Sequence, residues 1–171
     1  MAVAQLRHQN LVCLGGWCVH EDQLLLVYDY MPNLSLDRIL FKRPDCPSAP
    51  PLNWERRWRI LSGLATTMFY LHEQLETQII HRDVKTSNVM LDSNYNARLG
   101  DFGLARWLEH ELQYVAPCVD SNYEFRLAET TRIGGTIGYL LSESFQKRNT
   151  ATTKSNVFSF GIVVLEVESG R

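Results

Sequence analysis

The chain has 171 residues, which suits one domain or a large piece of one, and its 45% hydrophobic and 21% charged residues are typical of an ordinary globular protein. A net charge of −2, from 17 basic and 19 acidic residues, gives no indication of a nucleic-acid partner or of direct contact with a membrane surface. The four cysteines form no CxxC pair, which favours free thiols in a reducing compartment. The N-terminus lacks the apolar core of a signal peptide, and the apolar run 157–167 is too short to span a bilayer. We therefore expect this chain alone to be soluble and cytosolic.

The first part of the chain predicts a β-hairpin followed by a short helix. Two β-rich runs, 10–19 and 23–30, are linked by the polar residues 20–22. Pro32 and Asn33 break the second strand, and Ser35 is suited to cap a helix over 36–41. Segment 43–52 contains four prolines, so we expect a surface loop there.

A long helix is predicted from Asn53, which can cap it, to Gln74. Apolar residues recur at helical spacing, and this stripe is either an aromatic ligand site or the buried face of a core helix; we expect the buried face, formed by Trp54, Trp58, Leu61, Ala65, Met68 and Leu71/His72.

The second half predicts short strands at 79–80, 89–91 and 97–99, with a turn at 92–94. Residues 107–129 are poorly periodic, which indicates a mobile loop. Residues 153–169 are apolar nearly all round, so we expect a buried helix.

The segment 81–103 carries the chemistry. It begins with His81-Arg82-Asp83-Val84-Lys85-Thr86-Ser87-Asn88 and ends, after one predicted hairpin, with Asp101-Phe102-Gly103. Phosphoryl transfer needs positioning and charge neutralisation more than covalent work by the protein. In that interpretation Asp83 orients a substrate hydroxyl, Lys85 places a cation beside the phosphoryl oxygens, and Asn88 and Asp101 supply oxygen ligands for Mg²⁺ on ATP. The alternative is a loop held by structural salt bridges, which the ordered spacing disfavours.

These residues resemble a protein kinase domain of the plant receptor-like type, and in particular the legume-lectin receptor-like kinases. The resemblance also rests on His8–Val12, Leu26–Asn33, Gly135–Tyr139 and Phe158–Gly161. It implies an α+β fold of the protein-kinase type, truncated to a mostly helical large lobe plus a β-hairpin and hinge from the small lobe. On this interpretation residues 1–171 form a partial kinase domain, with 1–30 as the remnant of the small lobe and hinge strand and 31–171 as the large lobe up to its central buried helix.

The resemblance further implies roles around the nucleotide. Tyr28 takes the gatekeeper position, and Asp29 to Met31 form the hinge that binds adenine through its backbone. Met90 floors the adenine pocket, and Asp37 reaches the ribose. In the same way, Leu14, His81 and Phe102 match an apolar spine between the lobes, next to Gly103. For Tyr28 and Met90, simple core packing is the alternative.

The resemblance also implies regulation and substrate class. Arg82 before the catalytic Asp83 suggests control by phosphorylation, because an arginine can pair with a phosphate and order a loop. Thr130 and Thr131 are the expected acceptors, followed by Ser121, and the alternative is that these are ordinary loop hydroxyls. Thr136 matches the threonine that hydrogen-bonds the catalytic aspartate and lysine in Ser/Thr kinases.

Several positions depart from the family pattern. The chain shows no glycine-rich loop and no strand lysine, and family spacing places the partner glutamate upstream of Met1. Glu143 stands in a Leu-Ser-Glu in place of Ala-Pro-Glu, and its usual arginine partner would lie beyond Arg171. Asn156 replaces an aspartate, so its NH₂ would face a donor at a cost of roughly 1–3 kcal/mol. Leu34 replaces a glycine, which strains the turn if φ is positive.

The sequence thus predicts a fragment of a protein serine/threonine kinase that uses ATP and Mg²⁺ to phosphorylate protein hydroxyls in receptor-like signalling. The resemblance implies work at the cytoplasmic side of the plasma membrane. The alternative is a catalytically inactive truncated kinase that acts at most as a binding module. The apolar residues 24–27 of the hairpin are expected to be exposed.

Overall fold

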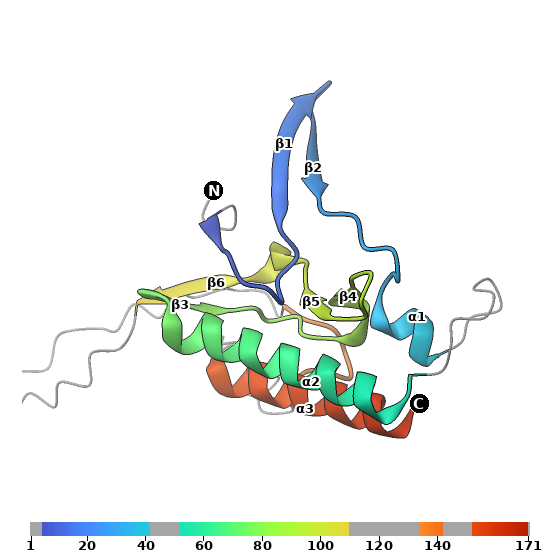
Figure 1. The fold of residues 1–171 in the computed structure, drawn as a ribbon. Coiled ribbons are helices and arrows are strands. Elements are labelled where there is room, and N and C mark those ends of the chain that lie inside the picture. Colours follow the sequence, from blue (N-terminus) through green and yellow to red (C-terminus); the bar gives the residue numbers. More distant parts are fainter. Residues whose placement is uncertain (1–4, 42–51, 110–133, 142–151, 171) are drawn as a thin grey trace, which may run out of the picture.

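The computed structural model describes residues 5–41, 52–109, 134–141 and 152–170 of the chain. Within them, two long helices lie side by side beneath short strands, and a hairpin stands on the opposite side of the strands (Figure 1). The strands form three antiparallel pairs, β1 with β2, β3 with β6 and β4 with β5. The elements are β1 (Leu14–His20), β2 (Gln23–Tyr28), α1 (Leu36–Leu40), α2 (Trp54–Phe69), β3 (Thr77–Ile80), β4 (Val89–Leu91), β5 (Ala97–Leu99), β6 (Arg106–Glu109) and α3 (Thr153–Ser169). The mixture of helices and small antiparallel sheets confirms the α+β class.

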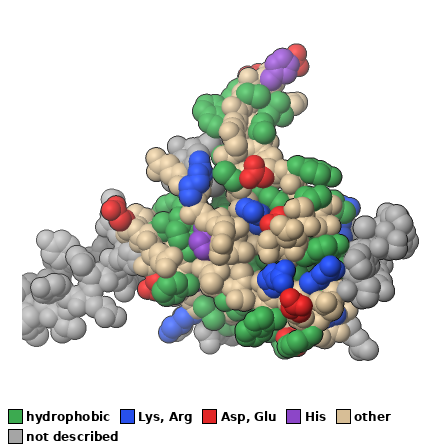
Figure 2. All heavy atoms as spheres, viewed as in Figure 1, with side chains coloured by type: hydrophobic (Ala, Val, Ile, Leu, Met, Phe, Trp, Pro, Cys, Tyr) green, Lys and Arg blue, Asp and Glu red, His purple; other side chains and the backbone are tan. Residues whose placement is uncertain are grey.

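The β1–β2 hairpin is confirmed, although its strands are shorter than the predicted runs. Its two turn residues, Glu21 and Asp22, have φ values of 47° and 62°, as a two-residue turn between twisted strands requires. The predicted exposure of residues 24–27 is also confirmed, since these side chains keep between 43% and 58% of their surface. Figure 2 shows apolar side chains along the projecting hairpin.

Helix α2 starts as predicted, because the Asn53 side chain accepts a hydrogen bond from the backbone N–H of Arg56. It continues as one π-helical turn over Tyr70–Gln74. The predicted buried stripe is wrong at Trp54 and Trp58, which are 61% and 65% exposed, and at Ala65, which is exposed. The true buried face is centred one step round the helix and consists of Ile60, Leu61, Leu64, Thr67, Met68 and Leu71.

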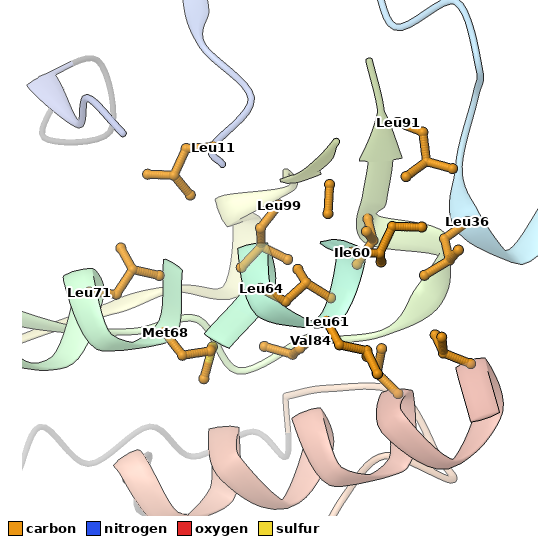
Figure 3. Close-up of a cluster of buried hydrophobic side chains, with 14 of the residues drawn as sticks. Leu11, Leu36, Ile60, Leu61, Leu64, Met68, Leu71, Val84, Leu91 and Leu99 are labelled. Atoms are coloured by element: carbon orange, nitrogen blue, oxygen red, sulfur yellow. The ribbon is translucent and has the colours of Figure 1, made fainter. Parts of the chain in front are cut away.

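The core lies between α2 and the β4–β5 hairpin and extends to the inner face of α3 (Figure 3). Leu64 and Leu99 are almost fully buried there, next to Leu36 from α1 and Leu91 from β4. Val84 of the loop after β3 joins the same cluster. The loop 81–88 is therefore anchored on the core by its own apolar residue.

Helix α3 is predicted to be buried all round, and this is wrong for the residues described. Its buried positions are Asn156, Ser159, Val163 and Val167, on one side of the helix, whereas Val157 and Leu165 are more than half exposed. The helix begins with a capping box between Thr152 and Ser155 and ends at Gly170 with φ of 68°. The reason is geometric: α2 and the segment after β3 cover only part of an apolar circumference.

Arg57 joins the two long helices. Its guanidinium donates to the backbone carbonyls of Val167 and Glu168 at the C-terminal end of α3 and to that of Leu52 before α2. The last carbonyls of a helix have no partner inside the helix, and they carry partial negative charge. Arg57 thus satisfies them with a cation from the neighbouring helix.

Asn10 joins three segments from inside the core. Its side-chain NH₂ donates to the carbonyl of Ala97 at 2.8 Å, and its own carbonyl accepts from the hydroxyl of Thr67 at 3.1 Å. Gly63 leaves the space for this side chain, since a Cβ there would lie 2.6 Å from Asn10 Nδ2. The segment before β1 is therefore fixed to both β5 and α2.

The turn before α1 does adopt the strained conformation that the sequence made conditional. Leu34 has φ of 59°, its N–H donates to the carbonyl of Met31, and its own carbonyl accepts from Leu91 N–H at 2.8 Å. A left-handed conformation costs a side-chain-bearing residue roughly 1–2 kcal/mol. Ser35 occupies the N-cap position as predicted, but its hydroxyl donates to the Asp37 carboxylate instead of accepting a backbone N–H.

The two predicted loops are tested in part. Residues 107–109 belong to strand β6, so the predicted mobile loop is wrong over its first three residues. Its remainder, and residues 43–51 of the proline-rich segment, lie outside the described residues. No helix in the described part of the chain combines the length and the apolar character needed to cross a bilayer.

Candidate active site

The predicted catalytic loop leaves the end of β3 and is fixed first by His81. This side chain is fully buried, its Nδ1 accepts from the N–H of Asp83 at 3.3 Å, and its Nε2 lies 2.9 Å from the carbonyl oxygen of Gly100. A backbone N–H can only donate, so Nδ1 carries the lone pair and Nε2–H donates to Gly100. The ring of Phe102 meets His81 edge-on at 4.7 Å. His81 therefore links the catalytic loop to the segment around Asp101.

Asp83 is held by three side chains on its two carboxylate oxygens. Lys85 Nζ lies 2.8 Å from Oδ2, Asn88 Nδ2 donates to Oδ2 at 3.1 Å, and the hydroxyl of Thr136 donates to Oδ1 at 2.6 Å. Lys85 also donates to the Thr136 hydroxyl at 2.8 Å. The chain thus brings together four predicted site residues from three segments.

The protonation state of Asp83 follows from these contacts. Burial alone would raise the pKa of the carboxyl, but hydrogen bonds from Lys85, Thr136 and Asn88, with the charge of Lys85, outweigh burial and lower the pKa below its usual value. Asp83 is therefore a carboxylate at neutral pH. Its fixed orientation suits accepting a hydrogen bond from a hydroxyl.

The two predicted metal ligands, Asn88 and Asp101, are connected through the backbone. The N–H of Gly100 donates to the carbonyl of Asn88 at 2.9 Å, which brings the start of the Asp-Phe-Gly segment beside Asn88. Asn88 uses its NH₂ on Asp83, so its amide oxygen faces away from that contact. Asp101 is exposed, and one of its oxygens accepts from Gly103 N–H.

This pair fits Mg²⁺ bound to a phosphate ligand. Mg²⁺ prefers oxygen ligands and is commonly held by one or two protein groups plus phosphates and water. Within the described residues no group of three His, Cys, Asp or Glu side chains is placed to hold a metal by itself. An amide and a carboxylate oxygen would leave most coordination positions to phosphate and water.

Arg82 adopts a left-handed backbone conformation, with φ of 72°. Its guanidinium lies against Gly134, and burial, with the nearby charge of Arg106, lowers its pKa. Its N–H donates to Asn156 Oδ1 at 2.9 Å. The predicted clash of the Asn156 NH₂ with a donor is wrong, because this group faces Nε2 of the His72 ring at 3.1 Å.

The residues predicted around adenine and ribose occupy one stretch of chain and the nearby strand β4. Tyr28 ends β2, and the N–H of Asp29 donates to the carbonyl of Cys13. Met31 is buried. Met90 lies in β4 and pairs with Ser35, which places it beside the helix that carries Asp37. Their predicted roles toward a nucleotide stay predictions.

Some expected and some unexpected residues complete the picture. Four predicted positions lie outside the described residues, namely Ser121, Thr130, Thr131 and Glu143. The sequence reasoning missed Tyr139, whose hydroxyl donates to the Glu166 carboxylate at 2.7 Å and lies 3.2 Å from that of Thr86. Burial raises the pKa of Tyr139 to about 12, to which Glu166 adds. The Gly-Thr-Ile-Gly-Tyr motif was the available signal.

A hollow of about 550 Å³ lies apart from these residues, against the outer side of α2. It is lined by polar groups that include Arg59 and Arg98, which pair with Glu55 and Asp92. None of the predicted catalytic residues lines it. The largest hollow therefore does not mark the candidate active site, which is defined by the contacts of Asp83.

Comparison with known proteins decides the family. The family described as "Protein tyrosine and serine/threonine kinase" matches residues 1–171. The chain belongs to the protein kinase family. Among curated relatives of this kinase chain, "Receptor like protein kinase S.2" of Arabidopsis thaliana is 66% identical over 100% of the chain and 21% of the relative. "Probable L-type lectin-domain containing receptor kinase S.7" of the same plant is 49% identical over 99% of the chain and 22% of the relative.

The kinase chain therefore spans about a fifth of the length of the curated relatives that it matches. A third relative, "L-type lectin-domain containing receptor kinase IV.3" of Arabidopsis thaliana, is 46% identical over 100% of the chain and 23% of its own length. The similarity to plant receptor-like and lectin receptor kinases agrees with the resemblance noted in the sequence.

Proposed function

We propose that this chain is the catalytic part of a serine/threonine protein kinase that transfers the γ-phosphate of ATP to protein hydroxyls. The observation that carries the proposal is the set of contacts on Asp83, from Lys85, Thr136 and Asn88. An ionised carboxylate with fixed orientation, a neighbouring cation and two oxygen ligands are the parts that phosphoryl transfer needs at this end of the nucleotide.

Each residue has a defined part in this proposal. Asp83 accepts a hydrogen bond from the substrate hydroxyl and orients it for in-line attack. Lys85, held by Asp83 and Thr136, presents a positive charge to the phosphoryl oxygens. Asn88 and Asp101 would hold Mg²⁺, which neutralises phosphate charge when bound. Thr136 links Asp83 and Lys85, which supports serine and threonine as the acceptors.

The proposal includes a division of the chain and a cellular place. Residues 1–30 belong to the small lobe and hinge strand, and residues 31–171 belong to the large lobe up to its central helix α3. Tyr28, Asp29, Met31, Asp37 and Met90 would surround adenine and ribose. The names of the relatives support a place in a membrane receptor, with this part on the cytoplasmic side.

The test is phosphate incorporation by the intact protein with labelled ATP, Mg²⁺ and a mixture of serine- and threonine-containing peptides. Asp83→Asn should lower the rate by about 10²–10⁴-fold, because the hydroxyl loses its oriented acceptor. Asp22→Asn is the matched control, since Asp22 lies in the exposed hairpin turn, where asparagine also tolerates the positive φ.

Nucleotide binding separates the two possible outcomes. A protein that binds Mg²⁺-ATP but transfers no phosphate under any of these conditions would support the alternative, an inactive binding module. Equal rates for the parent and Asp83→Asn would contradict the catalytic role of Asp83. Asp101→Asn should weaken binding of ATP in the presence of Mg²⁺ and leave binding without Mg²⁺ nearly unchanged.

A further inference from the structure

Three segments meet at Asn156, which has no exposed surface. Asn156 comes from the first turn of α3, the N–H of Arg82 comes from the catalytic loop, and His72 comes from the π-helical turn after α2. Asn156 Oδ1 lies 2.9 Å from Arg82 N, and Asn156 Nδ2 lies 3.1 Å from His72 Nε2. His72 is 6% exposed, so water cannot readily replace either partner.

The polarity of this chain of hydrogen bonds is fixed from one end. The N–H of Arg82 can only donate, so the group of Asn156 that faces it must be the amide oxygen. The NH₂ of Asn156 therefore faces His72, and it is a donor. A hydrogen bond forms there only if His72 Nε2 carries a lone pair, which requires a neutral ring protonated on Nδ1.

Two other histidines have the opposite arrangement. Nδ1 of His81 accepts from the N–H of Asp83, and Nδ1 of His8 accepts from the N–H of Asn10 at 3.1 Å. Both rings therefore carry the lone pair on Nδ1. Among the histidines in the described residues, His72 is the one whose contacts require the lone pair on Nε2.

We propose that His72 is a positioning residue for the catalytic loop, acting as a neutral hydrogen-bond acceptor that orients Asn156 toward the backbone of Arg82. The positioning role rests on the proposed kinase function, whereas the polarity of the pair does not. Protonation of His72 would turn its Nε2 into a donor that faces the NH₂ of Asn156. The contact would then be lost, and the side chain that holds the loop would be free to reorient.

The surroundings of His72 are compatible with a neutral ring. Burial lowers its pKa, and the field of Glu73, the next residue, partly opposes this. The groups that the neighbouring elements present are uncharged: the Asn156 amide from α3, the Arg82 N–H from the loop, and from β3 the Gln78 amide, which donates to the His72 carbonyl. The Arg82 guanidinium lies against Gly134.

The first experiment observes the tautomer directly. The five histidines of the intact protein are labelled with ¹⁵N, and the ring nitrogens are followed by NMR near pH 7.5, with the His72 signals assigned from His72→Gln. We expect His72 to show an unprotonated Nε2, whereas His81 and His8 show an unprotonated Nδ1. A His72 protonated on Nε2 at this pH would overturn the proposal. If His72→Gln does not fold, the signals that change in Asn156→Asp give the assignment.

The second experiment reverses the polarity. In Asn156→Asp the carboxylate can accept from both neighbours, so His72 becomes a donor and its pKa should rise. The parent should lose stability as the pH falls below about 6.5, because the unfolded histidine binds a proton that the folded ring resists, whereas Asn156→Asp should resist acid at this site. The ratio of the two unfolding constants, parent over variant, should therefore increase as the pH falls from 7.5 to 5, by at most about tenfold per pH unit.

His72→Gln supplies the control, because glutamine can donate or accept and does not titrate. In that background the same ratio should stay constant between pH 7.5 and 5. A flat ratio in the presence of His72, or an equal increase in its absence, would refute the pairing. Neither measurement uses phosphate transfer, so an inactive protein would leave this inference open to test and would count only against the proposed function.

Discussion

Replacing Arg57 by methionine removes the cation that α2 contributes to the end of α3. Methionine keeps an unbranched apolar side chain of similar length, so the change isolates the guanidinium. In the parent protein this group donates to the backbone carbonyls of Leu52, Val167 and Glu168, and the contacts with Leu52 and Glu168 measure 3.0 and 3.3 Å. The variant leaves these carbonyls, which are partly buried, without the donor.

The expected loss is about 2–3 kcal/mol in the free energy of unfolding. A hydrogen bond to a charged group contributes roughly 1.5–3 kcal/mol. A cation at a helix C-terminus adds roughly 0.3–1 kcal/mol. Some of this is recovered by water at the more exposed Glu168 carbonyl. Arg57→Lys should lose about half as much, because a lysine keeps the charge but cannot span several carbonyls in one plane.

The assay is urea unfolding of the intact protein, with thermal unfolding as a second measurement. At about 2–4 °C per kcal/mol for a chain of this size, Arg57→Met should lower the melting temperature by roughly 4–12 °C. Arg59→Met, two residues along α2, is the matched control: Arg59 makes an i,i+4 pair with Glu55 at the surface, which is worth roughly 0.3–0.5 kcal/mol. If the two variants unfold alike, the bridge between the helices does not stabilise the fold.

Other substitutions test the site and its supports. Gly135→Ala should destabilise the protein by about 1–3 kcal/mol in unfolding assays, because φ is 128° and the new Cβ would lie 2.9 Å from the carbonyl of Arg82; Gly161→Ala, with open space inside α3, should instead stabilise it by roughly 0.5–1 kcal/mol. Thr136→Val should slow phosphate transfer while Thr136→Ser largely preserves it, because only serine keeps the hydroxyl that donates to Asp83; equal rates would exclude this role. The unfolding free energy should fall between pH 6.5 and pH 5, since burial lowers the pKa of three histidines in the folded state and the unfolded chain takes up the protons; an unchanged stability would contradict this for His8, His72 and His81.

The features with local signals could be predicted from the sequence. Asn53 is followed by a helical pattern and caps α2, and the polar residues between two β-rich runs form the hairpin turn. The cluster around Asp83 was predictable because fixed spacing in one segment determines most of its contacts. The contribution of Thr136 came from resemblance alone, since nothing local indicates that it reaches Asp83.

The errors arose where an apolar pattern had more than one solution. Trp54 and Trp58 share a helical stripe with Leu61, and periodicity cannot tell whether this stripe or its neighbour faces the core. Helix α3 is apolar on every side, so its sequence does not show that one side alone is covered by the described residues. The partners of Arg57 and His72 lie 110 and 84 residues away, and such approaches depend on packing that no local pattern encodes.

The fit between Asn10 and Gly63 has a consequence for how this sequence can vary. Asn10 Nδ2 occupies the place where any side chain at position 63 would begin, yet it is also the group that donates to Ala97. A larger residue at position 63 is therefore tolerated only together with a smaller one at position 10, and that exchange removes the hydrogen bond to β5. Among homologous sequences, positions 10 and 63 should change as a pair or not at all. The order in which two such mutations arise would matter, because either one alone creates a clash or an unfilled space.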